Sequence, residues 1–273
     1  MPEGPEIRQS ADALAEVLVN QQIESVTLGL DKIRPFHDAL AGQTVKNVTC
    51  QGKAMLIHLT NNLSIYSHNQ LYGVWVIKKR GEMPDTQRSL RLALHVKAHS
   101  ALLYSASDIS VWRTDELPQH PFLRKLGPDV FSEGLHADDI AARLADKRFS
   151  GRSLSALYLD QHFIAGMGNY LRSEVLFFAR LHPDKKPKQL TSGAILTLAE
   201  QTIAVAWRSY RTGGYTVPEV PKDLALTGSA EYEASRFMVF DREKLPCRVC
   251  KAFVVRAERN GRRLYYCPVC QAC

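Results

Sequence analysis

The sequence predicts a mixed α+β protein built from more than one domain, and two observations support this. The hydrophobic period is helical over residues 3–21, changes to short β-rich runs over residues 23–112, and returns to helical after residue 121. Five of the six cysteines lie in the last 27 residues, which in a cytosolic chain indicates a metal site rather than disulfides. We therefore expect a helix and a β-domain, then a helical module, then a metal-bound finger.

The β-rich part follows an amphipathic helix over residues 3–21, in which Ile7, Ala11, Leu14 and Leu18 recur at helical spacing. Turn signals such as Asn61-Asn62 separate the expected strands. These strands are residues 23–30, 44–49, 55–60, 63–67, 72–78, 90–97, 101–105 and 109–112. Several short strands at this spacing predict a sandwich or a barrel.

The second half is predicted to be mainly helical. The expected helices are residues 136–147, 154–160, 169–181 and 190–210. Residues 211–235 contain glycines and prolines with little periodicity, which predicts a mobile loop and a domain junction.

Charge and hydropathy narrow the class of protein. The net charge is +7, and most of this excess lies in residues 236–273, with nine Lys or Arg and three Asp or Glu. Such a basic segment is weak evidence for a polyanionic partner. No apolar run approaches a membrane span and acidic residues interrupt residues 1–22, so we expect a soluble intracellular protein.

The C-terminal cysteines have the spacing of a metal site. Cys247-x-x-Cys250 and Cys267-x-x-Cys270 are separated by sixteen residues, and two such pairs present four thiolates to one tetrahedral zinc ion. Residues 253–257 and 262–266 read as strands around Asn260-Gly261, a hairpin-turn signal. Four sulfur ligands leave no open position, so the predicted zinc is structural. The alternative is reduced cysteines without metal.

The first six residues, Met1 to Glu6, suggest covalent chemistry. Removal of Met1 would leave Pro2 with a free secondary amine. An α-amino group titrates near about 7.7–8.0, so part of it is an unprotonated nucleophile at neutral pH. Such an amine forms a cationic iminium with an aldehyde carbon, and Glu3 and Glu6 supply nearby carboxyl groups for proton transfer. The alternative is that these residues only begin a helix.

Three further segments contain candidate binding residues. Gly166-Met167-Gly168-Asn169 precedes a helix, where Asn169 suits an N-cap and the helix end a phosphate, although most such sequences are merely caps. Residues 67–73 could fill the gap left by a base rotated out of a duplex, or could place Leu71 and Tyr72 in the core. Lys53 precedes a strand and by itself reads as a solvated lysine.

Together these motifs resemble the formamidopyrimidine-DNA glycosylase/endonuclease VIII family of base-excision repair enzymes. PEGPEIR, Gly-Lys53, SHNQLYGVW, LYSASDI, HPFLRKLGPDV, GMGNYLRSE and the cysteine finger occur in the family's order. SHNQLYGVW and MPEGPEIR are more similar to the endonuclease VIII branch. The resemblance implies a two-lobed molecule with an N-terminal helix and β-sandwich, a helix–two-turn–helix module and a zinc hairpin. The implied divisions are residues 1–118, 119–212, 213–236 as a lesion-recognition loop, and 237–273.

The resemblance also implies a bifunctional glycosylase and AP lyase acting on damaged double-stranded DNA. Pro2 would be the nucleophile, Glu3 the main proton donor, and Glu6 a supporting residue. Lys53 would assist β-elimination and Arg262 δ-elimination. The implied DNA-binding residues are Gln70, Leu71, Tyr72, Lys125 and Asn169. Lys125 stands where relatives carry an arginine. A lysine keeps the positive charge there but lacks the planar set of N–H donors of a guanidinium group.

Oxidised pyrimidines are the expected substrates, because the endonuclease VIII branch is the more similar one. Residues 211–235 are longer than the matching loop of typical endonuclease VIII sequences, which leaves 8-oxoguanine or formamidopyrimidine bases open. Two other classes are a non-catalytic DNA-binding protein and a zinc-ribbon protein of RNA. We expect one structural zinc, a monomer, and a bacterial cytoplasmic location at the nucleoid.

Overall fold

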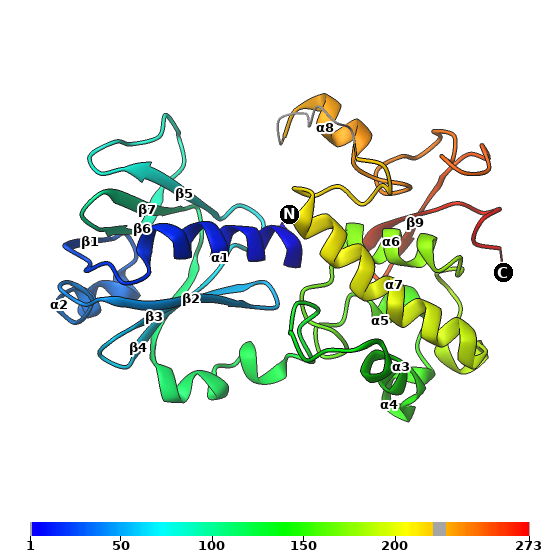
Figure 1. Ribbon diagram of the computed structural model, residues 1–273, viewed down its shortest axis with the longest axis horizontal. Coiled ribbons are helices and arrows are strands. Elements are labelled where there is room, and N and C mark those ends of the chain that lie inside the picture. The colour runs from blue at the N-terminus through cyan, green and yellow to red at the C-terminus, as the bar shows by residue number, and fades with distance from the viewer. Residues whose placement is uncertain (1, 221–227, 273) are drawn as a thin grey trace. The chain divides into compact units, whose positions relative to one another are not determined.

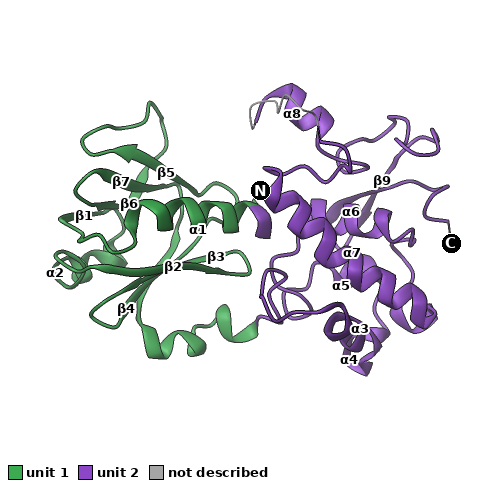
Figure 2. Ribbon diagram, viewed as in Figure 1, with its two compact units in different colours: residues 1–2, 6–125 green, residues 3–5, 126–273 purple. Residues whose placement is uncertain are grey.

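The structure is a computed structural model that describes residues 2–220 and 228–272 (Figure 1). The chain divides into two compact units (Figure 2). Unit 1 comprises residues 1–2 and 6–125, and unit 2 comprises residues 3–5 and 126–273. Residues 3–5 therefore belong with the C-terminal half of the sequence, which matters for the candidate site.

Unit 1 is a β-sandwich with a helix packed into its core. The helix is α1 (Gly4–Leu18), which from residue 6 onward counts with this unit. One antiparallel sheet has the order β1 (Ser25–Leu28), β6 (Leu90–His95), β7 (His99–Tyr104), β5 (Val74–Lys79). The other has the order β2 (Val45–Gln51), β3 (Ala54–Leu59), β4 (Leu63–His68), β8 (Asp108–Arg113). Short helices η1 (Asp31–Phe36), α2 (His37–Leu40), η2 (Thr114–Gln119) and η3 (Leu123–Lys125) complete the unit.

A single apolar core holds the two sheets and α1 together. Ala11, Leu14 and Leu18 of α1 are buried in one cluster with Leu94 of one sheet and Ile57 of the other. These are the helix positions that the apolar spacing predicted. Burying each of the large aliphatic side chains contributes about 1.5–3 kcal/mol relative to exposure. The prediction of a sandwich is confirmed.

Unit 2 is organised around one buried helix, α6 (Asn169–Phe178), whose residues from Tyr170 to Phe177 are all buried. The other helices are α3 (Ala137–Ala145), α4 (Lys147–Ser150), α5 (Leu154–Leu157), η4 (Pro187–Gln189), α7 (Ser192–Arg211) and α8 (Ala230–Ser235). Strands β9 (Val255–Arg259) and β10 (Arg262–Tyr266) form an antiparallel hairpin. Leu171 and Val175 of α6 pack with the helices, whereas Phe177 packs with the finger, so α6 serves both cores.

The predicted elements are found with local corrections. All eight strands of unit 1 form within a few residues of their expected positions. The expected helix 136–147 ends at Ala145, because Asp146 has extended backbone and caps the next helix, α4, by accepting from the Arg148 amide. Residues 211–235 were expected to be a loop throughout, but α8 forms at Ala230–Ser235. Ser229 caps α8 and Tyr232 is buried. The part of that loop at residues 221–227 lies outside the described residues.

Candidate active site

The Glu3 carboxylate occupies the N-terminus of the buried helix α6. Its Oε1 accepts a hydrogen bond from the Tyr170 amide at 2.8 Å and its Oε2 accepts one from the Leu171 amide at 3.2 Å. Glu3 is only 3% exposed. Helix N-termini favour negative charge, because the first amides are unpaired and the helix dipole is positive there. The sequence neighbour of Pro2 is thus fixed by a helix that lies 167 residues further along the chain.

Glycines make this close approach possible. The Gly4 amide donates to the Gly166 carbonyl at 2.8 Å. A Cβ atom at Gly168 would lie 2.3 Å from Glu3 Cδ and 2.4 Å from Glu3 Oε1, which is too close for any side chain. Gly168 has φ −149°, a conformation open to every residue, so space rather than backbone freedom requires glycine here.

This arrangement changes the interpretation of the segment 166–169 in two ways. Asn169 is the first residue of α6 rather than its N-cap; Gly168 is the N-cap and provides no side-chain bond. The helix end was open to two interpretations, a phosphate site or a plain cap, and its Tyr170 and Leu171 amides are already bonded to Glu3. An acidic side chain from a distant part of the sequence replaces the local cap, and local spacing could not reveal this.

Arg172 connects this helix end to the finger hairpin. It is fully buried, and its guanidinium donates to Asn169 Oδ1, the Ser155 carbonyl and the Arg263 carbonyl, each at 2.9 Å. Burial lowers the pKa of Arg172 to about 10, which still leaves it cationic at neutral pH. Because Arg172 takes Asn169 Oδ1, the group that Asn169 can offer to an anion is its amide NH₂.

Arg262 begins β10 at the exposed tip of the hairpin, opposite Arg259. The Arg259 guanidinium is engaged in an ion pair, because its Nε and Nη2 donate to the two carboxylate oxygens of Asp184 at 2.7 and 2.8 Å. The hairpin is also tied to α6 by the Tyr265 amide, which donates to Ser173 Oγ. Arg262 is therefore presented on a strand whose backbone is fixed to the helix that holds Glu3.

The four finger cysteines converge as their spacing predicted. Cys247, Cys250, Cys267 and Cys270 place their sulfur atoms within 4.8 Å of one another. A tetrahedral ion with zinc–sulfur bonds of about 2.3 Å separates its ligands by about 3.8 Å. The measured sulfur separations are 3.9 Å for Cys247–Cys270 and 3.4 Å for Cys250–Cys267. The residues therefore fit a four-thiolate metal site. Cys50 lies apart from this cluster in β2, and Cys273 lies outside the described residues.

Within unit 1, Lys53 follows Gly52 in the two-residue turn between β2 and β3, where Gln51 pairs with Ala54. Gly52 has φ +60°, which suits glycine at this position. Lys53 is half-buried rather than fully solvated. The tight turn thus fixes the point from which the lysine side chain leaves the sheet.

The loop between β4 and β5 exposes its apolar residues. Leu71 is 58% exposed and Tyr72 is 69% exposed, which excludes the alternative in which both lie in the core. Gln70 has φ +52°, its amide donates to His68 Nδ1, and its Oε1 accepts from Ser107 Oγ at 2.8 Å. The loop is therefore held at its base while it presents an aliphatic and an aromatic side chain to solvent.

The structure also gives the positions of the remaining predicted residues. Pro2 is half-buried and directly precedes Glu3. Glu6 is in the first turn of α1. Lys125 is the last residue of η3 and is exposed. Met1, whose removal the predicted Pro2 chemistry requires, lies outside the described residues.

Two family models match this chain. The formamidopyrimidine-DNA glycosylase N-terminal domain matches residues 1–107, and the formamidopyrimidine-DNA glycosylase H2TH domain matches residues 126–219. The chain belongs to the formamidopyrimidine-DNA glycosylase family. The chain is therefore a base-excision-repair DNA glycosylase with AP lyase activity that acts on damaged DNA, as its sequence predicted.

Relatives within the family support the endonuclease VIII branch. The chain is 40% identical to "Endonuclease 8" of Pectobacterium atrosepticum over 272 residues, which covers all of both chains. It is also 40% identical to "Endonuclease 8" of Escherichia coli over 271 residues, covering 99% of this chain and all of the relative.

Solved structures of Lactococcus lactis family members share the fold. A variant bound to DNA containing Fapy-dG has a TM-score of 0.83 with 22% identity, and both chains are fully covered. The wild-type enzyme bound to DNA containing an oxidized pyrimidine gives the same TM-score, identity and coverage. Within residues 2–220 and 228–272 of the present chain, no helix is long and apolar enough to cross a bilayer.

Sequence reasoning missed Arg172 and Glu174, and it named Gly168 within the segment 166–169 without its contact to Glu3. Gly168 makes room for Glu3, and Arg172 orients Asn169 and the hairpin. Glu174 is fully buried, and its carboxylate accepts from Thr216 Oγ1 and from the amides of residues 238–240. The available signal was two charged residues, Arg172 and Glu174, inside a predicted helix that is otherwise largely apolar, and charges in such a helix indicate a buried polar network.

Proposed function

We propose that this glycosylase removes oxidised pyrimidines from double-stranded DNA through a Schiff base at the amine of Pro2. The observation that carries the proposal is the fixed position of Glu3, whose carboxyl group is held by two amides next to Pro2 in the sequence. A nucleophile beside an oriented carboxyl group is the arrangement that covalent amine catalysis needs.

The proposed reaction begins with attack of the Pro2 nitrogen on C1′ of the damaged nucleotide. The C1′–N bond to the base breaks, and the base leaves with a proton while the attacking nitrogen loses its own. Proton transfer through Glu3 to O4′ then breaks the C1′–O4′ bond, which opens the sugar ring and leaves a C1′ iminium on Pro2. Loss of a C2′ proton, assisted by Lys53, breaks the C3′–O bond in β-elimination. A second elimination, assisted by Arg262, breaks the C5′–O bond. Water then releases the sugar fragment and regenerates the amine.

The DNA contacts that we propose use side chains presented by both units. Leu71 and Tyr72 are exposed at the end of a held loop, which suits them to fill the gap left by an everted nucleotide, with Gln70 beside them. Asn169 offers an amide NH₂ group to a phosphate, and Lys125 and Arg262 offer exposed cations. Glu6 supports the N-terminal turn.

We further propose that the four cysteines bind one structural zinc ion. The sulfur separations support a closed tetrahedral site without room for substrate. We retain the proposed division at residues 1–118, 119–212, 213–236 and 237–273, in which 213–236 helps to select the base. We expect a monomer that acts in the bacterial cytoplasm, at the nucleoid.

A panel of duplexes, each with one defined damaged base, tests the substrate proposal. The protein with Met1 removed should cut duplexes containing oxidised pyrimidines fastest and leave phosphate on both ends of the gap. Faster cutting at 8-oxoguanine or formamidopyrimidine would favour the purine-lesion alternative. Binding without any cutting would favour a non-catalytic DNA-binding protein.

Removal of the metal should weaken DNA binding more than it unfolds the chain. Cys247 and Cys267 lie in one core with Tyr265 of the hairpin, so losing the ion should release the strand that carries Arg262. Unit 1 has its own core and should keep its fold. We expect chelation to reduce duplex affinity at least about tenfold while most of the β-sheet circular dichroism signal remains. Full affinity after chelation would contradict this role of the hairpin.

Salt dependence tests the proposed phosphate contacts. Binding should weaken linearly on a logarithmic scale of salt, because each cation that neutralises a phosphate releases a counterion. Arg262→Ala and Lys125→Ala should each reduce this slope by roughly one unit. Asn169→Ala should lower affinity with little change in slope, because asparagine is uncharged. An unchanged slope in both cation variants would contradict the assignments.

A further inference from the structure

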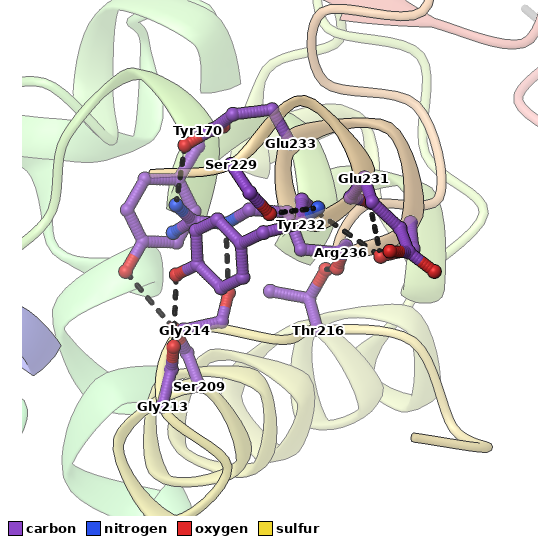
Figure 3. A network of polar contacts seen from close by, with 11 residues as sticks. Tyr170, Ser209, Gly213, Gly214, Thr216, Ser229, Glu231, Tyr232, Glu233 and Arg236 are labelled. Atoms are coloured by element: carbon purple, nitrogen blue, oxygen red, sulfur yellow. Dashed lines mark hydrogen bonds and ion pairs between the residues drawn. The ribbon is translucent and has the colours of Figure 1, made fainter. Parts of the chain in front are cut away.

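The two ends of the segment 213–236 are joined to each other. The Thr216 amide donates to the Arg236 carbonyl at 2.8 Å. Arg236 Nε donates to the Gly214 carbonyl at 3.0 Å, and the Tyr232 hydroxyl donates to the Gly213 carbonyl at 2.8 Å (Figure 3). We call these five residues the neck of the segment. It closes the segment at its base through three bonds, two of them from side chains.

The Arg236 side chain is enclosed by aromatic rings. Its guanidinium carbon lies 4.4 Å from the ring centre of Phe237, 4.5 Å from that of Tyr232 and 5.4 Å from that of Tyr170. The side chain is 10% exposed, and Glu233 pairs with it at 3.5 Å. A desolvated cation among ring faces is held more strongly than one in water. A planar guanidinium stacks on rings in a way that a lysine ammonium cannot reproduce.

Helix α8 presents Tyr232 to this cluster. Ser229 caps the helix by accepting from the Tyr232 amide at 3.1 Å, and Tyr232 itself is 2% exposed. The Gly214 backbone comes so close that a Cβ atom there would lie 2.1 Å from the Tyr232 hydroxyl. Gly214 also has φ +102°, so both space and conformation require glycine.

The neck is fastened to α6, the helix that holds Glu3. Tyr170 takes part in both arrangements: its amide donates to Glu3 Oε1, whereas its ring faces the Arg236 guanidinium. The Tyr170 hydroxyl also bonds Ser209 Oγ of α7 at 3.0 Å. A second neck residue also contacts α6: Thr216 is fully buried, and its hydroxyl donates to the Glu174 carboxylate of that helix.

We propose that Arg236, with Tyr232, is a positioning residue for base excision. It fixes the neck against Tyr170, so that the neck residues and the Glu3 carboxyl keep one geometry while the damaged base is expelled. The inference rests on the proposed function, in which this segment helps to select the base. The role concerns only substrates that carry a base, because cleavage of an abasic site requires no base to be expelled.

Two activities of the same protein distinguish a role in holding the base from a general role in supporting the fold. Excision from a duplex with an oxidised pyrimidine needs the base to be held, whereas cleavage of a pre-formed abasic duplex needs the amine and the elimination residues. Arg236→Lys keeps the positive charge but loses the guanidinium group that stacks on the rings and the hydrogen bond from Nε to the Gly214 carbonyl. Tyr232→Phe keeps the ring but loses the bond to Gly213. Arg148→Lys is the matched control, because Arg148 also binds a carboxylate and faces a ring, but on α4 at the surface.

Single-turnover rates on both duplexes, with the full-length protein lacking Met1, give the test. We expect Arg236→Lys to slow base excision about 10- to 100-fold and abasic cleavage less than about twofold. Tyr232→Phe should give a smaller loss in the same direction, and Arg148→Lys should change neither rate. Retained abasic cleavage also reports that the variant is folded.

Two results would overturn the inference. A parallel loss of both activities in Arg236→Lys and Tyr232→Phe would mean that the neck supports Glu3 or the fold in general. Unchanged base excision in both variants would mean that the neck has no part in holding the base. Failure of the proposed function looks different, because the unmodified protein itself would then fail to excise the oxidised pyrimidine, whether or not it cleaves the abasic duplex.

Discussion

Replacing Glu3 by glutamine is expected to slow base excision by about 10²- to 10⁴-fold, the contribution typical of a positioned proton donor. The substitution keeps the size of the side chain but removes its negative charge and its proton transfer. The amides of Tyr170 and Leu171 each donate to one oxygen of this carboxylate. In glutamine one of these oxygens is replaced by an NH₂ group, which cannot accept the hydrogen bond. Stability should fall by about 0.3–1 kcal/mol through the lost helix-end interaction.

Single-turnover excision and thermal unfolding measure the two effects of Glu3→Gln separately. Glu16→Gln is the matched control, because Glu16 lies on α1, the helix that directly follows Glu3, and is exposed. The control should change neither quantity. Excision by Glu3→Gln within a few fold of the unmodified protein would show that Glu3 only caps α6.

Replacing Gly168 by alanine is expected to reduce base excision about 100-fold without removing any functional group. The new Cβ atom would lie 2.3 Å from Glu3 Cδ and 2.7 Å from Glu3 Cγ, so the carboxyl group must leave its two amides. Displacements of about 1 Å at a reacting group can reduce rates by about two orders of magnitude. Backbone strain plays no part, because φ at Gly168 is −149°.

Gly151→Ala provides the matched control for Gly168→Ala, since a Cβ atom at Gly151 meets nothing within 4 Å. A double-mutant cycle sharpens the test. In a Glu3→Ala background, Gly168→Ala should cause little further loss, because the atoms that it displaces are gone. Additive losses in the double variant would show that Gly168 acts on something other than Glu3.

The sequence predicted most of the fold because its strongest signals are local. Alternation in unit 1 located eight strands, and the spacing of Ala11, Leu14 and Leu18 identified the buried face of α1. The paired cysteines predicted the metal cluster for the same reason. Helix α8 was missed because it is short and depends on burial of Tyr232, which comes from packing rather than from periodicity.

The candidate site could be predicted only in part, because its contacts join distant parts of the chain. Motifs identified Pro2, Glu3 and Asn169, but Asn169 was expected to cap α6. The N-cap is Gly168, which has no side chain, and Glu3 accepts the helix-end hydrogen bonds instead; a local pattern cannot show a partner 167 residues away. Arg172 and Arg236 were missed for the same reason: each acts through backbone carbonyls and rings that only the folded chain brings together.

The account depends on a covalent bond between the Pro2 nitrogen and C1′ of deoxyribose. Borohydride reduction of the protein with Met1 removed, mixed with duplex DNA containing an abasic site, tests this most directly. The account predicts a stable protein–DNA adduct that peptide mass spectrometry places on Pro2, and its loss when Met1 is retained. No adduct, or an adduct on a lysine such as Lys53, would contradict the account.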